Sequence, residues 1–208
     1  MTNKTESGNT FHRTKQIAII GVCSAMALLL MYIHFPVKYL GFMEMEFSDV
    51  PAVFCGLLFG PAAGVLVELI KNLLKLFGTT TAGVGEFANF LMMSSYVLGI
   101  SITARKQKET ASLKRYTISF IVGTVALVLM GIVVNYLITF PLYIQLYFGG
   151  NEGALIGMAQ GTLPGSLKGM ADSVGKMILV AVPPFNLLKG IIVSIVAYLV
   201  YKAVGNRL

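Results

Sequence analysis

Residues 50–77 read VPAVFCGLLFGPAAGVLVELIKNLLKLF, an apolar stretch that is interrupted by GPAAG at positions 60–64. Pro61 suits the first turn of a helix, and the glycines on either side permit a tight reversal of the chain. We therefore predict a hairpin of two helices, at residues 50–59 and 61–77. The first helix would rise only about 15 Å, well short of the roughly 30 Å hydrocarbon core of a bilayer. Other parts of the protein must then shield it.

The rest of the chain is as apolar as this hairpin. Of its 208 residues, 56% are hydrophobic and only 12% are charged, and the mean hydropathy is +0.78. Soluble domains carry about 25% charged residues, so a bilayer must be the main solvent of this chain. This excludes a soluble enzyme and a disordered tail. Further apolar segments predict an all-α integral membrane protein, a single membrane domain over residues 1–208 with six helices at about 16–35, 50–59, 61–77, 86–104, 114–140 and 183–204.

The distribution of charge decides the number of spans. The chain has 16 Lys and Arg against 9 Asp and Glu, and its basic residues gather before the first apolar segment, at residues 105–115 and at the C-terminal end. The positive-inside rule places all three groups in the cytoplasm. Five spans would put two of them outside, whereas six satisfy the rule with both termini cytoplasmic. We expect a multi-pass protein of a prokaryotic plasma membrane, and no nucleic-acid binding, because the basic residues do not share one face with aromatic residues.

The six-span topology leaves a long outer segment, residues 141–182, before the last helix. It is rich in glycine and contains aromatic and methionine side chains. Loops of this length are usually either functional or disordered. The aromatic content favours a lid or a pocket wall.

Polar side chains inside the predicted helices fall mainly in their outer halves. Ionisable groups are costly in a membrane and are functional candidates by default. This pattern predicts a polar-lined cavity that opens outward. The alternatives are lysines that extend their ammonium groups to the membrane surface and asparagines that join helices. The polar residues in these outer halves are Lys71, Asn72, Lys75, Glu86, Asn89, Asn135, Asn186 and Lys189.

Two acidic residues can be interpreted from their position in the predicted helices. Glu68 could pair with Lys71 or Asn72 on its own helix face, or it could carry a proton. Asp49 could cap the helix that begins at residue 50, with Pro51 in its first turn.

Catalytic and energy-coupling motifs are missing from the sequence. His12 and His34 are the only histidines, and neither suits a catalytic triad or a zinc site within the membrane. No phosphate-binding loop occurs. We therefore expect no enzyme activity, no metal and no cofactor, and a source of energy in other chains.

Small side chains at Ala18, Gly21 and Ala25 share one face of the first helix. Such spacing lets another helix approach closely. The face could serve packing within this chain or contact with a partner protein.

Several stretches resemble one family of membrane proteins, from about residue 16 to 204. They read EFSDVPA at 46–52, FGPAAGV at 59–65, VELIKNLL at 67–74, ANFL at 88–91 and PFNLLKG at 184–190. The chain resembles the riboflavin-specific S components of energy-coupling-factor (ECF) vitamin transporters. EFSDVPA and FNLLKG are the specific parts, because the GPxAG turn is shared more widely among S components.

The resemblance implies a six-helix protein that binds riboflavin from outside, as transported ligand rather than cofactor. It also implies association with one transmembrane coupling protein and two ATPases. Asn186 and Lys189 of FNLLKG, together with Asn135, would then bind the vitamin. The small-residue face of helix one is similar to the AxxxA coupling surface of the family, although Gly21 departs from alanine.

Riboflavin chemistry extends the set of expected contacts. The flat ring needs apolar and aromatic walls, and the ribityl chain needs hydrogen bonds. Asparagine offers a donor and an acceptor together, so Asn72, Asn89 and Glu46 are expected beside the three residues above. The main alternative is a self-sufficient proton-coupled secondary transporter that uses Glu68.

Overall fold

The computed structural model describes residues 3–33, 35–36, 38–107 and 112–205. His34 and residues 108–111 of the basic segment lie outside this range. The helices are α1 (Asn3–Met31), α2 (Val50–Phe59), α3 (Pro61–Lys75), the 3₁₀ turn η1 (Leu76–Gly78), α4 (Val84–Lys106), α5 (Ser112–Val134), the π-helix η2 (Asn135–Thr139), α6 (Phe140–Phe148), α7 (Glu152–Thr162), α8 (Gly165–Lys168) and α9 (Val174–Val204).

Four helical stretches of the described chain are long and apolar enough to cross a membrane. They are Arg13–Met31, Val84–Lys106, Leu113–Phe148 and Val174–Val204, and α2 is a shorter apolar helix. The fold is therefore the all-helical membrane architecture that the composition predicts.

The expected hairpin at residues 50–77 is confirmed. Phe59 ends α2, Pro61 begins α3, and Gly60 between them has φ +107°, a conformation that favours glycine. The Arg105 side chain, from the last turn of α4, donates a hydrogen bond to the carbonyl of Phe59. Residues 50–57 of α2 are all buried. The short helix is thus shielded by its neighbours, as its length requires.

The prediction of a long outer loop at residues 141–182 is wrong for most of that segment. The helix expected at 114–140 continues through η2 and α6 to Phe148, and the helix expected at 183–204 begins at Val174, so Pro183 and Pro184 lie inside α9. Pro141 has no N–H and crowds the preceding turn, and the wider π turn directly before it accommodates this. The expected helix end at residue 140 and the expected helix start at residue 183 were therefore both wrong.

Burial explains why α9 extends beyond its prolines. Met177, Ile178, Ala181 and Val182 are buried in a cluster with residues of α6, α7 and the segment before α2. A second cluster joins α1, α2, α3, α4 and the later part of α9. Tertiary packing thus stabilises a helical turn that the two prolines alone disfavour.

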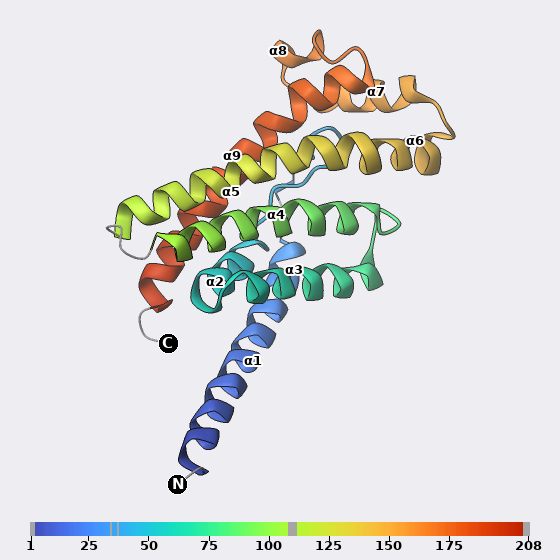
Figure 1. The fold of residues 1–208 in the computed structure, drawn as a ribbon. Helices are drawn as coiled ribbons and strands as arrows, with labels where there is room; N and C mark the ends of the chain where they lie inside the picture. Colours follow the sequence, from blue (N-terminus) through green and yellow to red (C-terminus); the bar gives the residue numbers. More distant parts are fainter. Residues whose placement is uncertain (1–2, 34, 37, 108–111, 206–208) are drawn as a thin grey trace.

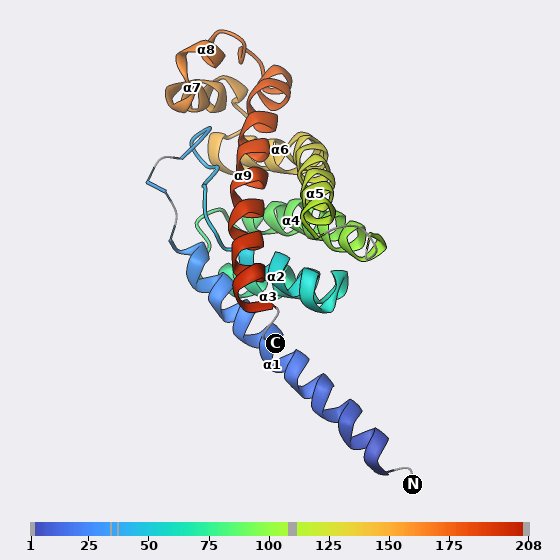
Figure 2. The ribbon, with the colours of Figure 1, turned by 90° about the vertical axis from the view of Figure 1, so that its left-hand side faces the viewer.

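α1 begins at Asn3, well before the expected residue 16, and the other helix boundaries differ less. α1 ends at Met31 rather than at residue 35, because the chain turns there and the Phe35 N–H donates to the carbonyl of Met45. α4 is longer at both ends than the expected 86–104. Figures 1 and 2 show α7 and α8 at the end of the molecule where α9 begins, and the N-terminal half of α1 extending away from the other helices.

The close approach of α2 and α3 generates a prediction for stability. A Cβ atom on Gly64 would lie 2.7 Å from the Ala52 carbonyl oxygen and 2.4 Å from a methyl group of Val97. We expect Gly64→Ala to force the helices apart and to lower the free energy of unfolding by about 1–3 kcal/mol. Thermal unfolding in detergent measures this. Gly157→Ala is the matched control, since a Cβ there meets nothing within 4 Å, and equal melting temperatures for the two variants would contradict the prediction.

Candidate functional site

A cavity of about 550 Å³ lies between the segment before α2, the C-terminal end of α3 and helices α4, α6 and α9. Its volume falls within the range of about 300–1,000 Å³ that is typical of small-molecule sites. Distant parts of the chain supply its wall, namely residues 38–46, the turn at 78–81, α4, η2, α6, Met158 of α7 and α9.

Five of the six side chains expected to bind ligand line this cavity: Glu46, Asn89, Asn135, Asn186 and Lys189. Asn135 lies in the π-helix, and its amide donates to the Gly131 carbonyl at 2.8 Å. The Asn186 amide nitrogen is buried and has no hydrogen-bond partner among the described residues. A buried donor without a partner is costly, so this nitrogen is suited to a ligand acceptor.

Asn72 is the sixth, and the structure places it behind the wall. Its amide nitrogen donates to the Glu68 carbonyl at 2.8 Å, and its oxygen accepts from the Asn89 amide at 3.2 Å. It therefore joins α3 to α4, which is the alternative interpretation of the intramembrane asparagines. Asn72 therefore contributes to the cavity by holding the side chain of Asn89, which lines it.

Aromatic rings form another part of the wall and fasten the segment before α2 over the cavity. Phe42 meets the ring of Tyr143 edge-on, with centroids 4.7 Å apart, and Tyr39 stacks on Phe185 at 5.4 Å. Phe42, Tyr143 and Phe185 line the cavity. Rings in offset or edge-on contact are attractive beyond the area they bury. The cavity thus combines amide, ammonium and carboxylate groups with aromatic faces.

Beside the cavity lies a buried cluster of charges. Lys71 is fully buried and contacts Asp49 and Glu68, the latter at 2.9 Å. Lys189 is nearly buried, 2.9 Å from the other oxygen of Asp49 and 3.6 Å from Glu46. Both ammonium groups are buried in ion pairs. The alternative interpretation, that these lysines extend to the membrane surface, is therefore wrong for both. Buried charges need partners of this kind because their desolvation costs several kcal/mol per ion.

The cluster corrects one expectation and confirms another. Asp49 occupies the N-cap position of α2, but its side chain makes no capping hydrogen bond and pairs with two lysines instead. Glu68 pairs with Lys71 on its own helix, as one of its two interpretations requires.

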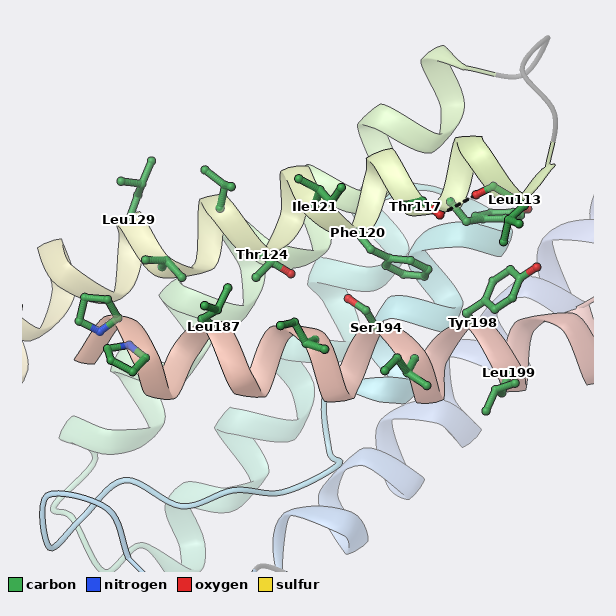
Figure 3. A pocket seen from close by; sticks show the side chains of 17 residues that line it. Leu113, Thr117, Phe120, Ile121, Thr124, Leu129, Leu187, Ser194, Tyr198 and Leu199 are labelled. Atoms are coloured by element: carbon green, nitrogen blue, oxygen red, sulfur yellow. Dashed lines mark hydrogen bonds between the residues drawn. The ribbon is translucent and has the colours of Figure 1, made fainter. Parts of the chain in front are cut away.

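A larger groove of about 830 Å³ runs between α5 and α9, as Figure 3 shows. Leucine, isoleucine, valine, proline and aromatic side chains dominate its wall, and Thr117, Thr124 and Ser194 supply its aliphatic hydroxyl groups. The Thr117 hydroxyl is already used, because it donates to the carbonyl of Leu113 at 2.9 Å. A groove so poor in charged and amide groups suits the hydrocarbon of the bilayer rather than a polar ligand.

The small residues of α1 lie away from both features. Ala18, Gly21 and Ala25 are exposed, and a Cβ on Gly21 would meet nothing within 4 Å. Packing within this chain therefore does not explain this face.

Sequence reasoning missed the contribution of Asp49 to the lysine cluster and the places of Thr139 and Phe185 in the cavity wall. The segment expected to form a lid or a pocket wall does supply lining residues, namely Tyr143, Tyr147, Phe148 and Met158. A signal for Asp49 was available, since two intramembrane lysines require nearby carboxylates. Thr139 and Phe185 lie inside helices that the sequence predicts, but no local pattern indicated that their side chains line the cavity.

Comparison with known proteins identifies the family. Residues 15–201 match the family model described as the substrate-specific component of ECF transporters. The chain is 31% identical to the riboflavin transporter RibU of Staphylococcus aureus (strain TCH60), over 94% of this chain and 93% of that protein. It is 30% identical to the riboflavin transporter FmnP of Bacillus subtilis (strain 168), over 91% of each chain.

A solved structure, of the S component of a bacterial ECF transporter, has the same architecture. It superposes with a TM-score of 0.63 at 32% identity, covering 93% of this chain and 97% of the other. The multi-pass helical fold and the family match agree over nearly the whole sequence. The chain therefore belongs to the substrate-specific S components of ECF transporters, and it is part of a transport system rather than an enzyme.

Proposed function

We propose that this S component binds riboflavin in the 550 Å³ cavity. The observation that carries the proposal is the composition of the cavity wall, in a chain about 30% identical to two proteins named riboflavin transporters. Amide and charged groups share the wall with aromatic rings. This combination suits a ligand with one flat ring system and one chain of hydroxyl groups.

The two kinds of wall would divide the ligand between them. The isoalloxazine ring would lie against aromatic side chains such as Phe42, Tyr143 and Phe185. Asn135, Asn186 and Lys189 would donate to oxygen or nitrogen atoms of the vitamin. Asn89 and Glu46 would complete the polar contacts, and Asn72 would hold Asn89 in place.

We also propose six membrane spans, made by α1, the α2–α3 hairpin, α4, the continuous helix from α5 to α6, and α9. The chain would be one domain in a bacterial cell membrane, with both termini and residues 105–115 in the cytoplasm and the cavity open to the outside. The support is the distribution of basic residues. The vitamin would thus be captured before it enters the cell.

Transport would be driven by other chains. The exposed face with Ala18, Gly21 and Ala25 on α1 would contact a transmembrane coupling protein, which two ATPases would move. The rival mechanism, proton coupling through Glu68, has less support. That carboxylate is fully buried, pairs with Lys71 at 2.9 Å and does not line the cavity.

Riboflavin titration of the purified protein tests the ligand and the site together. We expect the parent to bind riboflavin tightly, and Asn186→Ala and Lys189→Ala each to weaken binding by about 10-fold or more, since each removes a buried donor. Quenching of flavin fluorescence gives the dissociation constants. Ser101→Ala is the control, because Ser101 is buried but does not line the cavity. Parent-like affinity in both cavity variants would refute the assignment.

Cysteine labelling tests the topology. In a background with Cys23 and Cys55 replaced, Lys106→Cys and Glu152→Cys each offer one thiol at an exposed position. We expect a membrane-impermeant maleimide to label Glu152→Cys in intact cells and Lys106→Cys only after permeabilisation. Labelling of Lys106→Cys in intact cells would rule out the six-span arrangement.

Uptake assays distinguish transport driven by ATPases in other chains from proton coupling through Glu68. We expect riboflavin accumulation only when the coupling protein and both ATPases are co-expressed, and we expect Glu68→Gln to retain it within about threefold, because this side chain lies off the cavity wall. Accumulation by the chain alone, lost with an uncoupler and with Glu68→Gln, would establish the secondary transporter instead.

A further inference from the structure

A closed ring of five side chains lies beside the cavity. Two neighbouring members, Ser48 and Glu46, are joined by a hydrogen bond of 2.8 Å from the serine hydroxyl to the carboxylate. The Lys71 ammonium donates to the Ser48 hydroxyl at 2.8 Å and also to Asp49. Asp49 lies 2.9 Å from Lys189, and Lys189 lies 3.6 Å from the same Glu46 oxygen, which closes the ring.

Only two members of this ring line the cavity. Glu46 and Lys189 belong to the wall, whereas Ser48, Asp49 and Lys71 do not and have no exposed surface. The ring therefore has a cavity side and a supporting side. Asp49 connects the two, because one of its oxygens contacts the wall lysine and the other contacts the supporting lysine.

The Lys189 ammonium connects this ring to a ligand in the cavity, because it can donate to both. Lys189 has three N–H donors on a flexible stem. Asp49 lies 2.9 Å from its nitrogen, whereas Glu46 at 3.6 Å is beyond hydrogen-bond distance. The ammonium therefore keeps N–H donors for the cavity that Lys189 lines. Without Asp49 the nearest carboxylate is Glu46 at 3.6 Å, and the lysine stem would be free to take other rotamers.

We propose that Asp49 is a positioning residue for ligand binding, and that it holds the Lys189 ammonium so that another of its N–H donors meets the vitamin. Lys71 and Ser48 fix Asp49 and Glu46 in turn. The proposal rests on the proposed function, because it assumes that Lys189 contacts riboflavin. Asp49 itself would not touch the ligand.

A double-mutant cycle tests this role. Asp49→Asn keeps the size of the side chain and removes its charge. We expect it to weaken riboflavin binding by about 10- to 100-fold, by analogy with the loss of partners that orient metal ligands. In a Lys189→Met background the same substitution should change the dissociation constant by less than about threefold, because its target is gone. Equal losses in both backgrounds, or parent-like affinity of Asp49→Asn, would overturn the proposal.

Glu68→Gln is the matched control. It makes the same carboxylate-to-amide change at a fully buried residue of the same charge cluster, but its partner is Lys71 rather than Lys189. We expect its affinity for riboflavin to stay within about threefold of the parent, since it leaves the contacts of Lys189 intact. A loss as large as that of Asp49→Asn would show that any disturbance of the cluster suffices, and would overturn the specific role of Asp49.

Two further measurements keep the test decisive. Apo-protein melting temperatures and gel filtration show whether each variant folds. If Asp49→Asn does not, Ser48→Ala replaces it. This variant removes no charge and breaks the ring between Glu46 and Lys71, and we expect it to fold with a somewhat lower melting temperature and to bind riboflavin about 2- to 10-fold more weakly. Unchanged affinity would overturn the proposal. A parent protein that binds no riboflavin would instead refute the proposed function.

Discussion

The buried charges at Glu46, Asp49, Lys71 and Lys189 impose the strictest constraint on this structure. They come from the segment before α2, from α3 and from α9, and they meet where the protein leaves at most 6% of any of these residues exposed. Loss of one partner of a buried ion pair costs about 3–5 kcal/mol. The three segments must therefore come together for any of them to be stable. The segment before α2 is fixed at one end by these charges and along its length by stacked aromatic rings.

This constraint explains where the cavity lies. The segment before α2 cannot pack flat on α9. The buried charges anchor it at Glu46, and the aromatic side chains of Tyr39 and Phe42 pack against α9 and α6. The space enclosed between these attachments is lined by α4 and the π-helix as well. The larger groove between α5 and α9 lacks such anchors and has the character of a surface in contact with lipid (Figure 3). The cavity and the apolar groove thus lie on different faces of α9.

Much of this arrangement could be predicted from the sequence, and what could not has physical reasons. GPAAG at 60–64 predicts the hairpin, because proline and glycine act locally. The clustering of Asn89, Asn135, Asn186 and Lys189 follows from helix orientation alone, and the structure confirms it. The helical course of residues 141–148 and 174–182 was missed because packing overrides the local effect of Pro141 and Pro183. Asp49 was read as a cap because its partners lie more than twenty positions away in the chain.

A structure with riboflavin bound is the most direct measurement of the central claim, that the ring of charges and the aromatic wall together hold the vitamin. The account predicts electron density for the isoalloxazine against Phe42, Tyr143 or Phe185, and a hydrogen bond from the Lys189 ammonium to the ligand while Asp49 remains paired with that lysine. Density for the vitamin in the groove between α5 and α9, or in the cavity with Lys189 turned away from it, would contradict the account.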